Sequence, residues 1–262
     1  MTEVWSRLCE GRSNLFLFAV LPTVVVTLAY VLGAVVALVI ERLPSLGRYR
    51  LHRPSTRSEW LRCLGQVLRG KVLAEIPLTF AAYPAFVWLG LAKGTPLPGA
   101  LAVVGFLAAA FVVEDAWHYF AHRTLHTRWA FEHIHAVHHQ FRDTFAVAAN
   151  HAHPLETVFT GFGTVLPVLL LRPHLSTMLL WIALRQWQAM GVHLGFELPL
   201  RLGRIFPIFG GARFHDRHHH RYNRNFAPTF VWLDRLLGTE ERAVANAPEA
   251  ALSATTQESG PA

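Results

Sequence analysis

Long uninterrupted runs of apolar residues recur along this chain and predict helices that lie in a membrane. The first run, from Leu15 to Ile40, contains 26 residues without a charge. As an α-helix it would extend about 39 Å, enough to cross a hydrocarbon core of about 30 Å with some tilt. The apolar region of a secretory signal has only about 7–15 residues. This run therefore predicts a transmembrane helix.

Four later apolar segments predict the remaining helices of a bundle. They cover residues 72–92, 100–117, 154–171 and 175–196. Pro77 and Pro84 in the first of them predict a kink, because proline lacks the N–H of the helical hydrogen bond. His118 lies about 27 Å along the helix that starts at residue 100, and His193 lies about 27 Å along the helix that starts at residue 175. The two histidines are therefore expected at the same depth in the membrane. We predict an all-α integral membrane bundle with about four transmembrane helices, in a single membrane-embedded domain over residues 1–262.

Basic residues between the apolar segments indicate which side of the membrane the loops occupy. The stretch from Arg42 to Lys71 carries a strong cationic excess, and loops with such an excess stay on the cytoplasmic side. The topology that follows places residues 118–153 and 199–239 in a cytoplasmic, histidine-rich helical region that carries the chemistry. Residues 240–262, which are rich in Ala, Ser, Thr, Glu and Pro, predict a disordered tail.

Composition agrees with a membrane protein and excludes several other classes. The apolar share is 52% and the charged share 16%, against about 25% charged residues in an ordinary soluble domain. The net charge of +7 suits anionic lipid headgroups or an acidic partner. Nucleic acid is not an expected partner, because the basic residues form no stripe interleaved with aromatics. Two cysteines are too few for a disulfide framework or a zinc knuckle.

Histidine is the most unusual feature of the composition, with 16 residues. Three clusters have spacings that place several imidazoles on one helical face. They are His118 with His122, His135 with His138 and His139, and His215 with His218 and His219. This number of imidazoles exceeds the ligands of a four-coordinate zinc ion and suits two metal ions. The spacing predicts a dinuclear site without identifying the metal, because imidazole binds zinc, copper, nickel and iron.

Carboxylates near the clusters predict a shell of supporting residues. Asp115, Glu132 and Asp216 stand three residues before His118, His135 and His219 respectively. Such carboxylates can accept the second ring N–H and fix the tautomer of a ligand histidine. For Glu132 a helix cap or an exposed charge is an equal alternative. Five histidines outside the clusters are predicted on the surface, namely His52, His126, His133, His174 and His220.

The clusters and their flanking residues resemble the membrane-bound fatty acid hydroxylase/sterol desaturase superfamily. The matching stretches are Glu114 to Arg123, Ile134 to His139, Ala152 to Thr157, Phe214 to His219 and Asn225 to Thr239. The resemblance is closest to the C4-methylsterol oxidases and extends to the cholesterol 25-hydroxylases. It implies that His193 is a further metal ligand with His153 as its neighbour, and that no catalytic residue is needed beyond the metal centre. The methylsterol oxidases carry acidic residues where Asn150, Gln188 and Gly191 stand here, which leaves the substrate more open than the metal site.

The resemblance also implies a reaction and its partners. Members of the superfamily activate dioxygen at two iron ions and oxidise a C–H bond of a membrane lipid, which is a sterol in the methylsterol oxidases. Zinc has no redox cycle, although it can replace iron in an overexpressed sample. Electrons come from NAD(P)H through a reductase and cytochrome b5 or an equivalent carrier. The expected location is the endoplasmic reticulum membrane in a eukaryote or the inner membrane in a bacterium.

The sequence leaves other functions open. The same clusters would serve a hydroxylase or desaturase of another sterol, of a fatty acid or of a carotenoid. A metal transporter would also be rich in histidine, but it would carry ligands near the bilayer midplane, whereas these clusters lie at one edge. A histidine-rich membrane protein that binds structural zinc is the remaining non-enzymatic alternative.

Overall fold

The computed structural model describes residues 2–199 and 202–241, which form helices and no β-strand. The α-helices are α1 (Thr2–Cys9), α2 (Leu21–Arg42), α3 (Arg57–Gly70), α4 (Ile76–Trp88), α5 (Ala100–Leu125), α6 (Arg128–His133), α7 (Pro154–Leu171), α8 (Leu175–Val192), α9 (Leu202–Ile205), α10 (Ala212–Arg221) and α11 (Trp232–Leu236). The other helical elements are the π-helical turns η1 (Phe16–Val20) and η3 (Lys71–Glu75) and the 3-10 helices η2 (Pro44–Tyr49), η4 (His135–Gln140) and η5 (Ala146–Asn150). Beyond residue 241, the predicted tail lies outside the described residues.

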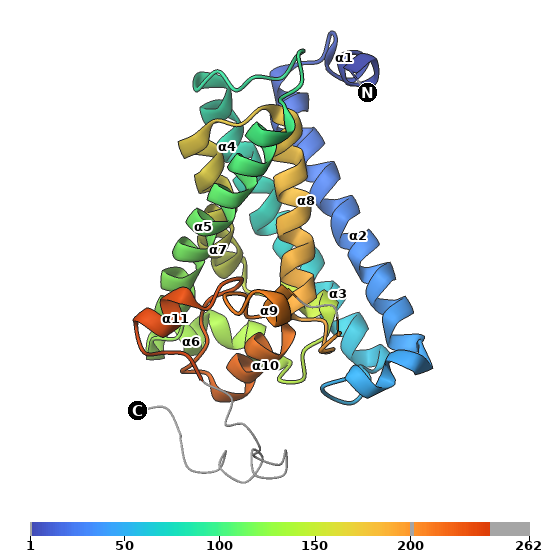
Figure 1. The fold of residues 1–262 in the computed structure, drawn as a ribbon, viewed down its shortest axis with the longest axis vertical. Helices are drawn as coiled ribbons and strands as arrows, with labels where there is room; N and C mark the ends of the chain where they lie inside the picture. Colours follow the sequence, from blue (N-terminus) through green and yellow to red (C-terminus); the bar gives the residue numbers. More distant parts are fainter. Residues whose placement is uncertain (1, 200–201, 242–262) are drawn as a thin grey trace.

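The long helices form an elongated bundle with short helices gathered at one end (Figure 1). α5 packs along α7, α2 packs along α8, and α4 lies against α7. In Figure 1 the short helices α3, α6, α9, α10 and α11 lie at the lower end, whereas α1 lies at the upper end. The all-α bundle that the sequence predicts is therefore confirmed.

Among the described residues, three helices are long and apolar enough to cross a membrane. They are Phe16–Arg42, Ala100–Leu125 and Pro154–Leu171. The sequence predicted about four. The count is lower because α4 has only 13 residues and because α8 carries a charged Arg185 beside polar Gln186 and Gln188. α8 nevertheless packs against all three apolar helices, and α4 packs against Phe16–Arg42 and α7.

The outer face of α2 consists of aliphatic side chains with no protein partner over much of their surface. Val31, Leu32, Val35 and Val39 each expose 50–53% of their area. Such a continuous apolar face is unfavourable in water but is solvated by lipid chains, which are as apolar as the side chains themselves. The face is therefore suited to contact the bilayer.

Helix α5 carries the first histidine cluster because it continues past the predicted apolar segment as far as Leu125. His118 and His122 therefore lie on one uninterrupted helix that begins among apolar residues. α5 and α7 approach closely at Gly163, where an added Cβ would lie 2.7 Å from Cδ1 of Trp117. This close approach holds α5, one residue before His118, against the middle of α7.

The irregularity expected from the prolines of residues 72–92 is a π-helical turn. It forms η3, which joins α3 to α4 without a loop. Pro77 at the start of α4 cannot donate to a carbonyl in the preceding turn, and a wider turn accommodates that loss. Pro84 lies inside α4.

Candidate metal centre

Nine histidines converge at the lower end of the bundle in two groups. In each group the ligand nitrogens all lie within 4.8 Å of one another. The first group is His122, His126, His135, His139 and His218, and the second is His138, His193, His215 and His219. All nine are buried except His126, which is partly buried. Each of these two adjoining sets could hold a metal ion.

Helical spacing distributes the clusters between the two groups. On α10, His215 and His219 are four residues apart and join the second group, whereas His218 joins the first. In the 3-10 helix η4, His135 and His139 join the first group and His138 joins the second. These two clusters therefore each supply ligands to both groups.

Burial keeps these rings neutral. Desolvation lowers the pKa of His138 to about 3, that of His218 to about 4 and that of His126 to about 2. Desolvation also lowers the pKa well below its usual range in His135, His139, His193, His215 and His219. A neutral imidazole carries one N–H and one lone pair, and it is the form that binds a metal ion.

In four rings the single proton is directed outward. The Nδ1 atom faces a backbone carbonyl oxygen, which can only accept, so the proton lies on Nδ1 and the Nε2 atom is left as a lone pair. The partners are Phe226 O for His122 (2.8 Å), His151 O for His138 (3.2 Å), Ala189 O for His193 (2.8 Å) and Arg224 O for His218 (2.7 Å). Nδ1 of His135 lies 2.9 Å from a carboxylate oxygen of Glu156.

The inward Nε2 atoms lie close together. His122 and His135 approach to 3.0 Å, and His138 and His193 approach to 3.3 Å. Because His138 and His193 both use their proton on a backbone carbonyl, two lone pairs meet between these two rings in a site from which water is largely excluded. A cation between them turns this repulsion into coordination, so the residues present fit a pair of metal ions.

The structure places His118 and His153, two further predicted ligands, outside both groups. His118 lines a neighbouring cavity with its ring centroid 5.6 Å from that of His122. Its Nδ1 lies 3.3 Å from both Glu114 Oε1 and Arg185 Nη2. His153 is the N-cap of α7, where its Nδ1 accepts from the backbone N–H of Leu155 at 3.2 Å.

His126, which the sequence assigns to the surface, lies in the first group instead. Its Nε2 is 3.1 Å from that of His218. The signal that could have found it is its spacing, since it stands four residues after His122 at the end of α5.

None of the three carboxylates expected to support the ligands contacts its predicted histidine. Asp115 accepts from the backbone N–H groups of Thr229 and Phe230 and from Trp232 Nε1, all at 2.9–3.0 Å. Glu132 forms an exposed ion pair with Arg128, which matches the alternative of an exposed charge. The third carboxylate, Asp216, lies 2.7 Å from His52 Nε2.

Other carboxylates occupy these supporting positions. Glu156 of α7 contacts His135, and Glu114 lies one turn before His118. Both side chains are buried, which strengthens their electrostatic contacts. Glu156 follows His135 by 21 residues, so no local spacing connects the two in the sequence.

A smaller group lies outside the metal centre, where His52, Asp143 and His220 bring their polar atoms together. The rings of His52 and His220 are stacked with centroids 5.8 Å apart. Asp143 lies 3.7 Å from a nitrogen of each ring. These contacts join the segment after η2 to α10.

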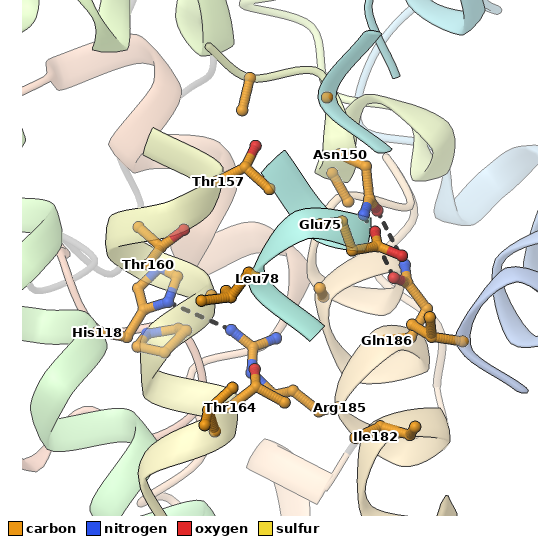
Figure 2. Close-up of a pocket in the computed structure, with 18 of the residues that line it drawn as sticks. Glu75, Leu78, His118, Asn150, Thr157, Thr160, Thr164, Ile182, Arg185 and Gln186 are labelled. Atoms are coloured by element: carbon orange, nitrogen blue, oxygen red, sulfur yellow. Dashed lines mark hydrogen bonds between the residues drawn. The ribbon is translucent and has the colours of Figure 1, made fainter. Parts of the chain in front are cut away.

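A cavity of about 240 Å³ adjoins the histidine groups and reaches into the apolar part of the bundle. Its lining comes mainly from α4, α7 and α8, and apolar side chains such as Leu78, Val168 and Met178 cover much of it. Figure 2 shows polar side chains at two places: Asn150 and Gln186 are hydrogen-bonded on one side, and Arg185 faces His118 on the other. The site therefore combines a metal-binding end with a lipid-like interior.

Comparison with known proteins agrees with this geometry. The model of the fatty acid hydroxylase family matches residues 107–239, which contain all nine grouped histidines. A very-long-chain aldehyde decarbonylase from Oryza sativa subsp. indica is 35% identical over 88% of this chain and 90% of its own length. Methylsterol monooxygenase 2-2 from Arabidopsis thaliana is 34% identical over 77% of each chain, and a methylsterol monooxygenase from Aspergillus fumigatus is 36% identical over 78% of this chain and 71% of its own. No solved structure matches.

Proposed function

This chain belongs to the fatty acid hydroxylase family, and from that premise we propose that it is a membrane-bound di-iron monooxygenase that oxidises a sterol, with a C4-methyl group as the site of reaction. The observation that carries the proposal is the pair of buried histidine groups beside a largely apolar cavity. Relatives named methylsterol monooxygenases, at 34–36% identity, support the choice of substrate.

We propose that each histidine group holds one iron ion, with His118 as a further donor on the cavity side. Bound iron would supply the redox chemistry for dioxygen activation, which zinc lacks. The chain itself fixes several donor atoms, because backbone carbonyls retain the Nδ1 protons of rings such as His138 and His193 and leave their Nε2 atoms free.

The proposed reaction converts a C–H bond and dioxygen into an alcohol and water, with uptake of two electrons and two protons. Repeated at the same carbon, it would take a methyl group through alcohol and aldehyde to carboxylate. The electrons are proposed to come from NAD(P)H through a reductase and cytochrome b5 or an equivalent carrier. Exposed arginines near the metal centre, such as Arg128 and Arg224, would attract an acidic carrier.

The position of the cavity favours a flat apolar substrate. It lies between helices whose outer faces are apolar, so a lipid could reach it from the bilayer without crossing water. Within the basic stretch from Arg42 to Lys71, α3 lies toward the same end of the bundle as α10, which carries three of the grouped histidines (Figure 1). By the positive-inside rule we propose that this end faces the cytoplasm, from the endoplasmic reticulum membrane in a eukaryote or the inner membrane in a bacterium.

Expression in a host blocked in sterol C4-demethylation tests the proposal. Membranes from cells that produce the chain should convert the accumulated 4-methyl sterol into oxidised or demethylated products, read by mass spectrometry. Cells that produce a His138→Ala variant provide the control. Unchanged 4-methyl sterol with correctly inserted, iron-loaded wild-type protein would contradict the proposal.

A second candidate substrate is a very-long-chain aldehyde. The rice relatives that carry an aldehyde decarbonylase name match a larger share of this chain than the Arabidopsis and Aspergillus relatives. The same membranes, supplied with a very-long-chain aldehyde, distinguish the two candidates. Loss of the aldehyde with formation of a shortened hydrocarbon, and no change in the sterols, would favour this second function.

A further inference from the structure

Arg185 is a buried cation in the wall of the cavity, within a bundle that is otherwise largely apolar. The residue exposes only 8% of its surface and lies on α8. Its Nη2 is 2.7 Å from Glu114 Oε1, and its Nη1 donates to Gln188 Oε1 at 2.6 Å. A buried ionic side chain at membrane depth is costly and is usually retained for function.

The internal contacts of Arg185 do not use all of its hydrogen-bond donors. A guanidinium group has five N–H donors, and the buried Nε of Arg185 has no partner. The other polar side chains at this level are paired with each other: Asn150 and Gln186 exchange two hydrogen bonds, and Lys71 Nζ donates to Glu75. Arg185 is therefore a cavity-lining cation whose buried Nε donor has no partner.

The position of Arg185 links this donor to the metal centre. Figure 2 shows its guanidinium directed toward His118, with Thr160 and Thr164 of α7 nearby. The Nη2 atom lies 3.3 Å from His118 Nδ1, and His118 adjoins His122 of the first group. A lipid oxygen bound by Arg185 would hold the neighbouring carbon atoms close to the histidines.

We propose that Arg185 anchors an oxygen substituent of the lipid substrate, so the chain selects lipids that carry a hydroxyl or carbonyl oxygen near the carbon that reacts. The proposal rests on the proposed function and adds the chemical feature by which the substrate is recognised. Glu114 and Gln188 act as positioning residues, because they hold the guanidinium in place. The polar contact would fix which carbon faces the metal centre, whereas apolar contacts alone would allow the lipid to slide.

Equilibrium binding to the purified full-length protein in detergent tests the anchor without any turnover. The probes are 4α-methylcholestanol, which has a 3-hydroxyl group, and 4α-methylcholestane, which lacks it. We expect the hydroxylated lipid to bind about tenfold or more tightly, because a desolvated charged donor is left unpaired by the deoxy lipid. Equal affinity of the wild-type protein for the two lipids would overturn the proposal.

Variants assign the preference to the residue. Arg185→Met should abolish the preference for the hydroxylated lipid over the deoxy lipid, whereas Arg185→Lys should keep part of that preference. The Arg128→Met variant, at an exposed residue, should keep all of it. Because Arg185→Met alone strands the buried Glu114, the double variant with Glu114→Gln removes both charges together. A preference that survives in the double variant overturns the anchor.

The anchor and the proposed function fail in different ways. If 4α-methylcholestanol binds with the hydroxyl preference but the reconstituted wild-type protein does not oxidise it, the sterol function fails and the anchor stands. If the protein oxidises it and Arg185→Met changes neither KM nor the position of the new oxygen, the anchor fails and the function stands.

Discussion

His138 and His193 face each other through Nε2 atoms 3.3 Å apart, while the Nδ1 of each donates to a backbone carbonyl oxygen. The two residues are 55 positions apart and come from different elements, η4 and the end of α8. Neither ring has a proton left for the other, so the contact is unfavourable unless a cation lies between the nitrogens. The arrangement of these two rings therefore supports a bound metal ion in the second group.

Removal of His138 should therefore deplete one of the two proposed ions. We expect a His138→Ala variant to lose the ion of the second group and nearly all turnover, because only three histidines of that group remain. Metal content per chain, measured by mass spectrometry on purified protein, checks this. The matched control is His133→Ala, since His133 is exposed in the same segment and bonds only to Trp129 O. Full metal content in the His138→Ala variant would contradict the assignment.

Glu156 should raise the metal affinity of the first histidine group through its contact with His135. A Glu156→Ala variant removes the carboxylate that holds Nδ1 of His135 at 2.9 Å, and loss of such a partner lowers metal affinity by about 10–100-fold. Metal retention against a chelator series measures the effect. Glu132→Ala serves as the control, because Glu132 contacts Arg128 at the surface and not His135. Equal sensitivity of the two variants to chelator would count against the role of Glu156.

Asp115 should contribute to stability instead of to metal binding. Its carboxylate accepts three hydrogen bonds from Thr229, Phe230 and Trp232, which tie the C-terminal segment to α5. An Asp115→Ala variant leaves buried donors unpaired and should lose about 1–3 kcal/mol per unsatisfied group. Thermal unfolding and limited proteolysis in detergent would detect the loosened segment. Loss of metal with unchanged stability is the opposite result and would restore the role expected from the sequence.

Glu59 should give helix α3 a stability that depends on pH. Hydrogen bonds from Arg53, together with those from Thr56, lower the pKa of Glu59 to about 2 in the folded protein. The folded state thus favours the carboxylate, which stabilises it fully above about pH 4.5, the ordinary pKa, and progressively less as the pH falls toward 2. Glu59 also closes the capping box with Thr56, an arrangement worth about 1 kcal/mol.

The comparison of wild-type protein with a Glu59→Gln variant isolates this contribution. The difference in unfolding temperature should be largest near neutral pH and should shrink between about pH 4.5 and pH 2, because the protonated glutamate resembles glutamine. Other groups that titrate in acid lower the unfolding temperature of both proteins equally, so their effects cancel in the difference. A difference that stays constant over this range would show that Glu59 does not titrate as the structure indicates.

Much of the site was predictable because its signals are local. The spacing of His215, His218 and His219 predicts a common helical face, and the structure has them on α10. The apolar runs likewise predict helices from side-chain hydropathy alone, and α7 has the predicted bounds of 154–171. Such features depend on residues within one or two turns, whose relative positions the helix itself fixes.

The sequence by itself determined that the chain is a helical membrane protein with clustered histidines, since periodicity and hydropathy are properties of short segments. Only the tertiary structure decided which histidines share a group, that His126 joins them, and that Glu156 contacts His135 in place of Glu132. It also placed Arg185 beside Glu114 and His118. These contacts join residues on different helices, and no local spacing encodes them, because helix packing alone sets which faces meet.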